Sequence, residues 1–325
     1  MISPPQVVTV TLNPALDQTL SVPGFAAGQV NRVAASRTDP GGKGVNVACF
    51  LADLGQAVAA TGFLGEDNAA PFEELFDRKG IDDRFVRLPG ATRVGIKVVD
   101  EQAEQTTDLN FPGLAPGEQD LAELLGRVAA LAEPGVWVVL SGSVPAGVSA
   151  DVYARLIEVV HRQGARVVLD TSGPPLRAAL AARPAAVKPN AAELAELVGR
   201  ALGTVAEVRA AGASLLERGV GRVVVSMGAE GALFLEDGQA VLARPPRVAV
   251  QSSVGAGDAL VGGLVFAQLR GLPLEEAARI ATGSGAYAVT RIGPGIADLA
   301  EHRALIERVE IEAWDGMRER CRRSG

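Results

Sequence analysis

A run of small residues followed by one carboxylate stands at the start of an apolar stretch, at Gly255-Ala256-Gly257-Asp258. A helix that begins there leaves the backbone N–H groups of its first turn without intrahelical partners. Together with the helix dipole, the N–H groups of Ala256, Gly257 and Asp258 would bind an anion such as a phosphate in transfer. Asp258 could accept the proton of an attacking alcohol at the same place. The segment predicts phosphoryl transfer to a hydroxyl, although an acid that only begins a helix beside packing glycines explains it, taken alone, at least as well.

Two segments near the N-terminus could contact a substrate. Asp17 follows the first apolar run and could accept hydrogen bonds from hydroxyl groups, but a turn residue is equally compatible. The segment Gly41-Gly42-Lys43-Gly44-Val45-Asn46 is a glycine-rich entrance to a helix, where the backbone at Gly42 would allow a ligand to come close. Lys43 offers a cation and Asn46 could bind a hydroxyl, whereas the alternative is a solvated lysine on an ordinary turn. The phosphate-loop pattern G-x-x-x-x-G-K-[ST] is absent, because a glycine follows the lysine.

The segment Lys188-Pro189-Asn190-Ala191-Ala192-Glu193 has both a structural and a functional interpretation. Asn190 and Glu193 have the spacing of a reciprocal cap at a helix start, and the spacing by itself favours that cap. The functional interpretation places Glu193 near a Mg²⁺ ion, through water, and Lys188 or Asn190 near nucleotide phosphates.

Two further turns follow strands and contain small residues. Ser141 begins the segment Ser141-Gly142-Ser143, which leaves room for a substrate but is a weak signal. The other turn contains Ser226, Gly228 and Gly231 and could seat a nucleotide, whereas a plain hairpin is the alternative.

Composition excludes several classes of function. The net charge of −7 and the pI near 5.1 argue against nucleic-acid binding, and the longest apolar runs are too short to span a membrane. The N-terminus lacks the basic start and apolar block of a signal peptide. Cys49 and Cys321 suit neither a disulfide framework nor a zinc site and fit a reducing cytoplasm. His161 and His302, the only histidines, lie outside the glycine-rich loops and are expected on the surface or on the sides of helices.

β-branched runs alternate with helical patterns, which predicts an α/β fold with parallel strands and crossover helices. The strands read as continuous apolar runs, as expected where helices cover both faces of a sheet. Strands are expected at Val7–Leu12, Val58–Phe63, Val136–Ser141, Arg166–Asp170, Ala186–Lys188 and Arg222–Met227. Helices are expected at Val45–Leu54, Phe72–Arg78, Leu121–Ala132, Val152–Gln163, Val205–Glu217 and Ala259–Leu269. Two-residue alternation at Thr19–Ala35 and Arg93–Phe111 predicts a small separate sheet that lies over the strand ends as a lid.

The segments occur in the order N-P-x-x-D, G-G-K-G-x-N, S-G-S-x-P-x-G, K-P-N-x-x-E, S-x-G-x-x-G and V-G-A-G-D. This order resembles the ribokinase-like (PfkB) family of carbohydrate kinases, from about Val7 to about Gly295. The resemblance implies a three-layer α/β/α fold with a mostly parallel central sheet. It also implies a single kinase domain over residues 1–325, with a small β-sheet lid formed by about 16–36 and 92–112.

The resemblance implies a mechanism as well. ATP would be the phosphoryl donor, Asp258 the catalytic base, and Gly255, Ala256 and Gly257 the anion hole. The helix start should also lower the pKa of Asp258 and weaken it as a base, which phosphoryl transfer tolerates because positioning and charge stabilisation dominate it. Mg²⁺ would accompany ATP, held mainly by phosphates and water. K⁺ could bind at backbone carbonyls, for which Ser252 and Val254 are the matching positions.

Within the family, the sequence is most similar to the bacterial enzymes that phosphorylate fructose 1-phosphate. The similarity rests on Thr11–Asp17, Gly62–Asn68, Thr92-Arg93 and Asp108–Phe111. A phosphorylated sugar needs cations at the end opposite the transfer site. Lys43 and Arg93 are the candidates, with Arg32 as a further one, and each could instead be a solvated lid charge. Asp17, Asn46 and Asn110 would then bind sugar hydroxyls.

Other functions remain open at this point. Kinases for tagatose 6-phosphate or fructose 6-phosphate share most of the segments, and a sugar-phosphate sensor without catalysis could use the same scaffold. The intact G-A-G-D segment argues against the sensor. A nicotinamide dehydrogenase is a poor candidate, because no G-x-G-x-x-G follows the first strand. We expect a cytoplasmic protein with no nucleic-acid or membrane partner, and a homodimer that forms through the lid.

Overall fold

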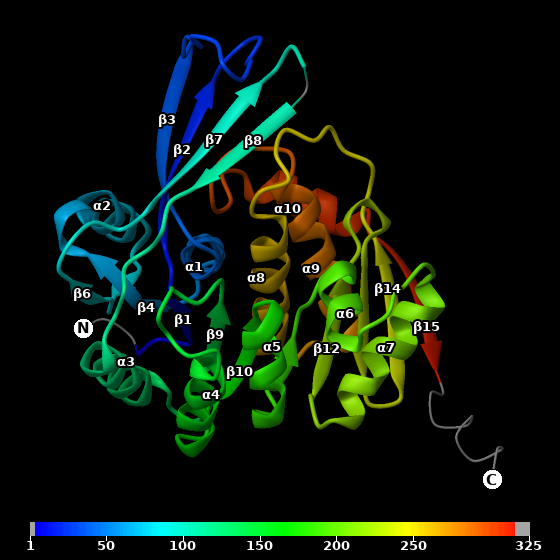
Figure 1. Cartoon of the computed structure of the whole chain (residues 1–325). Helices are drawn as coiled ribbons and strands as arrows, with labels where there is room; N and C mark the ends of the chain where they lie inside the picture. Colours follow the sequence, from blue (N-terminus) through cyan, green and yellow to red (C-terminus); the bar gives the residue numbers. More distant parts are fainter. Residues whose placement is uncertain (1–3, 104, 316–325) are drawn as a thin grey trace.

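The computed structural model describes residues 4–103 and 105–315, which form two separate β-sheets and ten α-helices (Figure 1). The larger sheet has the strand order β15-β14-β13-β12-β11-β10-β9-β1-β4-β5, and β6 also pairs with β4. In this spatial order, the strands from β12 through β1 to β5 pair in parallel. The strands β13, β14 and β15 add antiparallel pairs at the other end. The strands of this sheet are β1 (Val7–Thr11), β4 (Val58–Gly65), β5 (Asp82–Asp83), β6 (Val86–Leu88), β9 (Trp137–Ser141), β10 (Arg166–Asp170), β11 (Ala186–Val187), β12 (Arg222–Ser226), β13 (Ala232–Glu236), β14 (Gln239–Arg244) and β15 (Glu310–Asp315).

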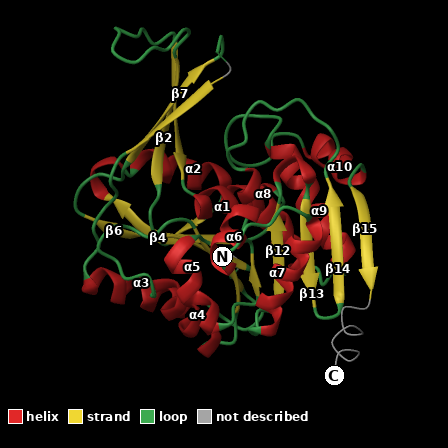
Figure 2. Cartoon of the chain, turned by 45° about the vertical axis from the view of Figure 1, so that its right-hand side comes forward, coloured by secondary structure: helices red, strands yellow, loops and turns green. Residues whose placement is uncertain are grey.

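Helices cover both faces of this sheet, which makes three layers (Figure 2). One face carries α1 (Lys43–Asp53), α2 (Ala70–Lys79), α8 (Ala256–Leu269), α9 (Leu274–Ala288) and α10 (Leu299–Glu307). The other face carries α3 (Glu118–Leu131), α4 (Val152–Arg162), α5 (Gly173–Ala179), α6 (Ala191–Val198) and α7 (Val205–Glu217).

The core is divided by the sheet into two apolar layers, because successive side chains of a strand point to opposite faces. In β1, Val7 packs with residues of α1 and α8, whereas Val8 and Val10 pack with residues of α3 and α4. All five residues of β1 are buried. Burial on both faces explains why the strand sequences are continuous apolar runs rather than alternating ones.

The second sheet projects from one end of the molecule (Figure 1). It has the strand order β3-β2-β7-β8, with β2 (Ala15–Ser21), β3 (Ala35–Gly41), β7 (Val94–Asp100) and β8 (Gln105–Asn110). β2 follows β1 after only three residues, so this sheet is attached at the carboxyl end of a central strand of the main sheet. That end is where open α/β sheets bind their ligands.

The α/β prediction is confirmed, and the six expected strands and six expected helices occur with ends shifted by up to three residues. The predicted small separate sheet is confirmed, but the alternation expected at Thr19–Ala35 does not correspond to strand over its whole length. A loop over residues 22–34 separates β2 from β3. Several elements were not predicted, among them the antiparallel strands β14 and β15 at the edge of the main sheet.

The cysteines and histidines show no reactive site in the described residues. Burial raises the pKa of the Cys49 thiol to about 12, and Cys321 lies outside the described residues. His161 is exposed on α4, as expected. His302 lies on α10 but is buried, which lowers its pKa to about 4. No helix among the described residues is long and apolar enough to cross a membrane.

Candidate active site

Helix α8 begins with the predicted arrangement of free backbone donors. Gly255 precedes the helix in the left-handed region, with φ of 84°, which favours glycine. The first hydrogen bond of the helix runs from the N–H of Ala259 to the carbonyl of Gly255, at 2.8 Å. The N–H groups of Ala256, Gly257 and Asp258 lie before that bond, so this turn can donate to an anion.

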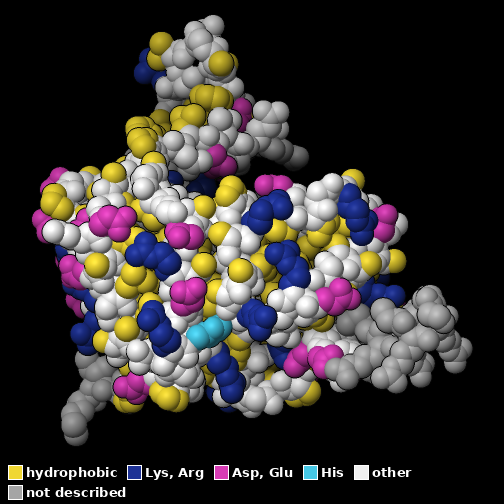
Figure 3. Space-filling model, turned by 60° about the horizontal axis from the view of Figure 1, so that its bottom comes forward, with side chains coloured by type: hydrophobic (Ala, Val, Ile, Leu, Met, Phe, Trp, Pro, Cys, Tyr) yellow, Lys and Arg dark blue, Asp and Glu magenta, His cyan; other side chains and the backbone are white. Residues whose placement is uncertain are grey.

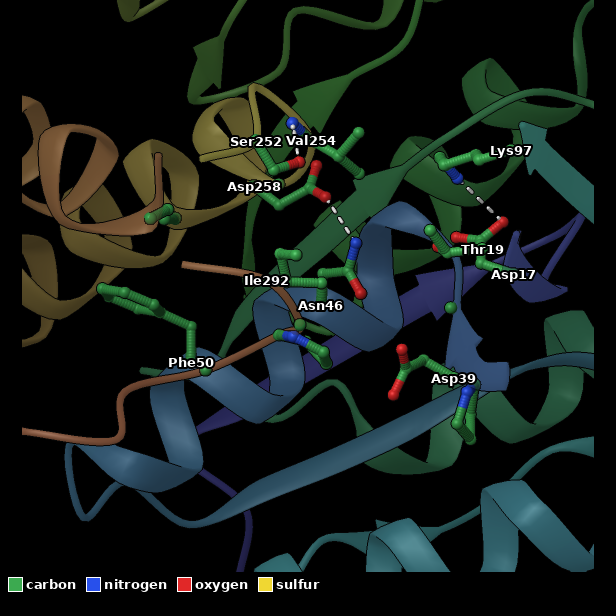
Figure 4. A pocket seen from close by; sticks show the side chains of 18 residues that line it. Asp17, Thr19, Asp39, Asn46, Phe50, Lys97, Ser252, Val254, Asp258 and Ile292 are labelled. Carbon is green, nitrogen blue, oxygen red and sulfur yellow. Dashed lines mark hydrogen bonds and ion pairs between the residues drawn. The ribbon is translucent and has the colours of Figure 1, made fainter. Parts of the chain in front are cut away.

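Asp258 lies on the first turn of α8 and is 6% exposed. The side-chain nitrogen of Asn46 donates to its Oδ2 at 2.7 Å (Figure 4). Burial, followed by the negative charge of Asp170, raises the pKa of Asp258 from 3.8 to about 6. The expectation that the helix start would lower this pKa is wrong, because desolvation outweighs the favourable contributions of Asn46, Lys43 and Lys188. A carboxylate with this pKa is a better proton acceptor near neutral pH than an exposed one.

A cavity of about 580 Å³ opens beside Asp258 at the carboxyl ends of the central strands. It reaches from β2 and α1 to the turn after β12. The sequence-predicted residues that line it are Asp17, Gly42, Lys43, Asn46, Arg93, Lys188, Asn190, Glu193, Ser226, Val254, Gly255, Gly257 and Asp258. Residues as far apart in the chain as Asp17 and Asp258 therefore meet at one place.

Six predicted residues do not line this cavity: Asn110, Ser141, Gly228, Gly231, Ser252 and Ala256. Ser141 is fully buried below it, and Ser252 lines a smaller neighbouring cavity of about 80 Å³. The further candidate Arg32 is exposed in the loop between β2 and β3 and lines neither cavity.

The glycine-rich entrance to α1 packs directly against β1 and its following turn. A Cβ on Gly42 would lie 2.9 Å from Thr11 Cγ2, and a Cβ on Gly44 would collide with the Thr11 hydroxyl. Gly42 also has φ of 119°, outside the range that side-chain-bearing residues favour. This close approach places Lys43 and Asn46 beside the carboxyl end of β1.

Asp17 lies in a slot between neighbouring strands of the second sheet. A Cβ on Gly41 of β3 would be 2.6 Å from Asp17 Oδ2, and a Cβ on Gly95 of β7 would be 2.7 Å from Asp17 Oδ1. The slot therefore exists only because both flanking positions are glycines. The Lys97 ammonium lies 3.3 Å from Asp17 Oδ1 (Figure 4), and the side chain of Asn110 reaches over Gly95 from β8.

Arg93 lies where the second sheet meets the main domain. Its Nη2 donates to the carbonyl oxygen of Asn13 at 3.4 Å. Its Nε is buried without a hydrogen-bond partner among the described residues. Asn13 in turn donates from its side chain to Ser143 Oγ, at 3.0 Å. Arg93, Asn13 and Ser143 all line the large cavity, and together they offer donors for an anionic group.

Asp170 was not among the site residues predicted from the sequence. It ends β10, is fully buried, and lies 3.1 Å from the Lys188 ammonium and 3.3 Å from the Lys43 ammonium. Lys188 is itself only 4% exposed, and its Nζ would lie 3.6 Å from a Cβ on Gly257, so it stands against the first turn of α8. The position of Asp170 could have been noticed in the sequence, because it is a single acidic residue at the carboxyl end of an apolar strand, where open α/β sheets bind their ligands.

Asn190 and Glu193 form the reciprocal helix cap that their spacing favours. Glu193 N donates to Asn190 Oδ1 at 2.8 Å, and Asn190 N donates to Glu193 Oε2 at 2.8 Å. No group of three or more His, Cys, Asp or Glu side chains that could bind a metal ion occurs in residues 4–103 and 105–315. The carboxylates that line the cavity are those of Asp17, Glu193 and Asp258, which do not form such a group, so the residues present fit a Mg²⁺ ion whose ligands are mainly phosphates and water.

The turn after β12 is part of a hairpin with β13. Ser226 lines the cavity, and its N–H donates to the carbonyl oxygen of Pro189 at 3.1 Å. Gly228 has φ of 61°, and a Cβ on Gly231 would collide with the carbonyl oxygen of Ala243. Both glycines are therefore required by the hairpin itself.

Ser252 and Val254 lie in the loop before α8. The N–H of Val254 donates to Ser252 Oγ at 3.2 Å, and both residues line the smaller cavity (Figure 4). The loop is fixed to α9, because the N–H groups of Gln251 and Ser252 both donate to the carbonyl oxygen of Val289.

Comparison with known sequences shows one family over most of the chain. The pattern of the pfkB family of carbohydrate kinases matches residues 10–301. The 1-phosphofructokinase of Rhodobacter capsulatus is 51% identical over 308 residues, which are 94% of this chain and 98% of that protein. The 1-phosphofructokinase of Escherichia coli K12 is 37% identical over 310 residues, which are 95% of this chain and 99% of that protein.

Solved structures with the same fold are also found. Escherichia coli phosphofructokinase-2 in complex with substrates and products aligns with a TM-score of 0.88 and 32% identity, over 93% of this chain and 98% of that chain. The same enzyme in complex with potassium aligns with a TM-score of 0.87, and its tetrameric inhibited form with a TM-score of 0.86, at the same identity and coverage.

Proposed function

Because this chain belongs to the pfkB family of carbohydrate kinases, we propose that it transfers the γ-phosphoryl group of ATP to fructose 1-phosphate. The observation that carries the proposal is the position of Asp258, a buried carboxylate with a raised pKa beside free N–H donors at one cavity. The similarity to 1-phosphofructokinases over nearly the whole chain supports fructose 1-phosphate as the acceptor. Fructose 1,6-bisphosphate and ADP would be the products.

The reaction needs one proton acceptor and strong stabilisation of the phosphoryl charge. The oxygen of the C6 hydroxyl forms a bond to the γ-phosphorus while the bond from that phosphorus to the β,γ-bridging oxygen breaks. Asp258 takes the hydroxyl proton. The N–H groups of Ala256, Gly257 and Asp258, with the nearby Lys188 ammonium, hold the negative charge of the phosphoryl oxygens.

The other residues of the cavity would position the two substrates. Asp17 and Asn46 would bind the sugar hydroxyls, with Asn110 contributing from β8. Arg93 would hold the 1-phosphate, whereas Lys43, which shares the Asp170 carboxylate with Lys188, would lie beside the phosphoryl group in transfer. Asn190, Ser226 and the hairpin glycines Gly228 and Gly231 would lie along the nucleotide.

Mg²⁺ would be bound with ATP, with Glu193 contributing through water, and its charge would reduce repulsion between the phosphates. We further propose K⁺ at the loop that contains Ser252 and Val254. The single domain would use the second sheet as a lid whose closure excludes water and so limits hydrolysis of ATP. A cytoplasmic location fits the low cysteine content.

A coupled assay of ADP release tests this function. We expect kcat/KM for fructose 1-phosphate to exceed the values for fructose 6-phosphate, tagatose 6-phosphate and unphosphorylated fructose by about 10- to 100-fold, since a charge-assisted phosphate contact is worth about 1.5–3 kcal/mol. EDTA should abolish the activity, and replacement of K⁺ by Na⁺ should lower it. A preference for either 6-phosphate would reassign the substrate, and no ADP release with any sugar would favour a sensor.

We also propose that two copies associate through the lid. In the register of the second sheet, Leu20, Ile96 and Leu109 face away from the row that contains Asp17. Leu109 is 50% exposed and Val33, in the adjoining loop, is 51% exposed. Figure 3 shows hydrophobic side chains gathered along this projecting part. An exposed apolar surface of this kind is typical of a site that binds another protein.

Light scattering tests the assembly. A molar mass twice that of the chain is expected, and Leu109→Glu should reduce it to that of one chain because a charge on an apolar interface is costly. A monomer at micromolar concentration, or a dimer that Leu109→Glu leaves intact, would contradict association through this face.

A further inference from the structure

The buried carboxylate of Asp170 contacts both lysines of the candidate site. Its Oδ1 lies 3.3 Å from Lys43 Nζ and 3.1 Å from Lys188 Nζ, and its Oδ2 accepts from Ser141 Oγ at 3.4 Å. Asp170 is fully buried. Both lysines line the large cavity, whereas Asp170 does not, so Asp170 would act on a ligand in the cavity through neighbouring groups and not by direct contact.

Each partner in this cluster requires the others. Two ammonium groups that approach the same oxygen atom would repel each other without the carboxylate between them. The carboxylate in turn would be strongly unfavourable in the interior without opposite charges and hydrogen bonds. Burial lowers the pKa of Lys43, but the charges of Asp170, Asp258 and Glu193 outweigh it and raise the pKa above its ordinary value. Lys43 therefore stays charged at neutral pH.

The ammonium groups of Lys43 and Lys188 both lie close to Asp258. Lys188 stands against Gly257, in the turn whose N–H groups face the cavity. Lys43 is close enough to Asp258 and Glu193 for their charges to act on it. A phosphoryl group passing between ATP and a hydroxyl held at Asp258 would therefore lie near both ammonium groups.

We propose that Asp170 is a positioning residue that holds Lys43 and Lys188 side by side, so that both cations meet the phosphoryl group during transfer. The inference rests on the proposed kinase function and adds to it the residue that organises the cations. Preorganised charges of this kind act without reorganisation at the moment of reaction, which is why their fixed position matters for kcat.

Asp170 also affects Asp258 through its charge. The charged groups that act on Asp258 are Asp170, which raises its pKa, and Lys43 and Lys188, which lower it. Removal of the Asp170 charge would therefore lower the pKa of Asp258. A residue that merely filled space at this position would leave that pKa unchanged.

Asp170→Asn tests the proposal in the full-length enzyme. We expect kcat to fall about 10- to 100-fold and KM for fructose 1-phosphate to change less than kcat. We expect the acid limb of the pH profile of kcat/KM to follow the titration of Asp258, whose pKa is raised to about 6, and to shift to lower pH when the charge of Asp170 is removed. The matched control is Glu236→Gln, which removes one charge from the Arg222–Glu236 ion pair at the amino end of β12, away from the cavity, and it should change neither quantity.

A double-mutant cycle keeps the test decisive if Asp170→Asn folds poorly. Asp170→Asn combined with Lys188→Met removes the buried ammonium together with the carboxylate and leaves only Lys43, whose side chain is 41% exposed, without that partner, so it should fold better. If Asp170 acts through Lys188, the double variant should have nearly the kcat of Lys188→Met alone. Full additivity would overturn the proposal.

Two other results would also overturn it: an unchanged acid limb with normal kcat, or a change confined to the Mg²⁺ concentration required for half-maximal rate. The second result would make Asp170 part of a metal site. Failure of the kinase function is distinguishable, because the unmodified enzyme would then be inactive with every sugar phosphate.

Discussion

Asp258→Asn should lower kcat for fructose 1-phosphate by about 1,000-fold, because general-base catalysis typically contributes 100- to 10,000-fold. Asparagine has nearly the same shape and its side-chain oxygen can still accept from Asn46, but it cannot take the hydroxyl proton. The fold and the affinity for ATP should be retained. Steady-state kinetics measure the loss of turnover, and calorimetric titration measures ATP binding.

The same substitution should stabilise the protein at neutral pH. The pKa of Asp258 is raised from 3.8 to about 6, so ionisation of this side chain costs stability in the folded state, and the cost grows as pH rises from about 4 to about 6. With about 1.4 kcal/mol for each pKa unit, Asp258→Asn should raise the free energy of unfolding at pH 7 by up to about 3 kcal/mol. Asp151→Asn, the same change at an exposed helix start without a capping bond from its side chain, is the control and should alter neither property. A kcat of Asp258→Asn within tenfold of the unmodified enzyme would remove Asp258 from the mechanism.

Arg93→Ala should raise KM for fructose 1-phosphate by about 10- to 100-fold with a smaller effect on kcat. The substitution removes a guanidinium that lines the large cavity, and a hydrogen bond to a charged group is worth about 1.5–3 kcal/mol. KM for ATP should stay unchanged, because the N–H donors that would hold its phosphoryl group lie at α8. Initial rates measured over both substrate concentrations separate these effects.

Arg32→Ala is the matched control for Arg93→Ala. Arg32 carries the same charge but is exposed and lines neither cavity, so this change should leave KM for fructose 1-phosphate unaltered. If both substitutions had equal effects, the 1-phosphate would be attracted by overall charge and not held by Arg93. If Arg93→Ala had no effect, the phosphate would bind elsewhere in the cavity.

The local environment of Asp258 shows where sequence reasoning failed. The helix start is visible in the sequence, and its dipole alone would lower the pKa of the carboxyl. The raised pKa comes from burial and from Asp170, which lies 88 positions earlier in the chain and reaches the site only because β10 ends beside α8. Desolvation and long-range charge depend on packing, so no local pattern contains them.

The sequence by itself determined the α/β class, the approximate place of most central strands and helices, the free amides at Gly255–Asp258 and the Asn190–Glu193 cap, because each depends on short-range periodicity or on spacing within one helical turn. Only the tertiary structure decided that Asp170 lies between Lys43 and Lys188 and that Asp17 occupies a slot made by Gly41 and Gly95. These contacts join separate strands and helices, and their geometry follows from how the sheet brings distant segments to the same edge.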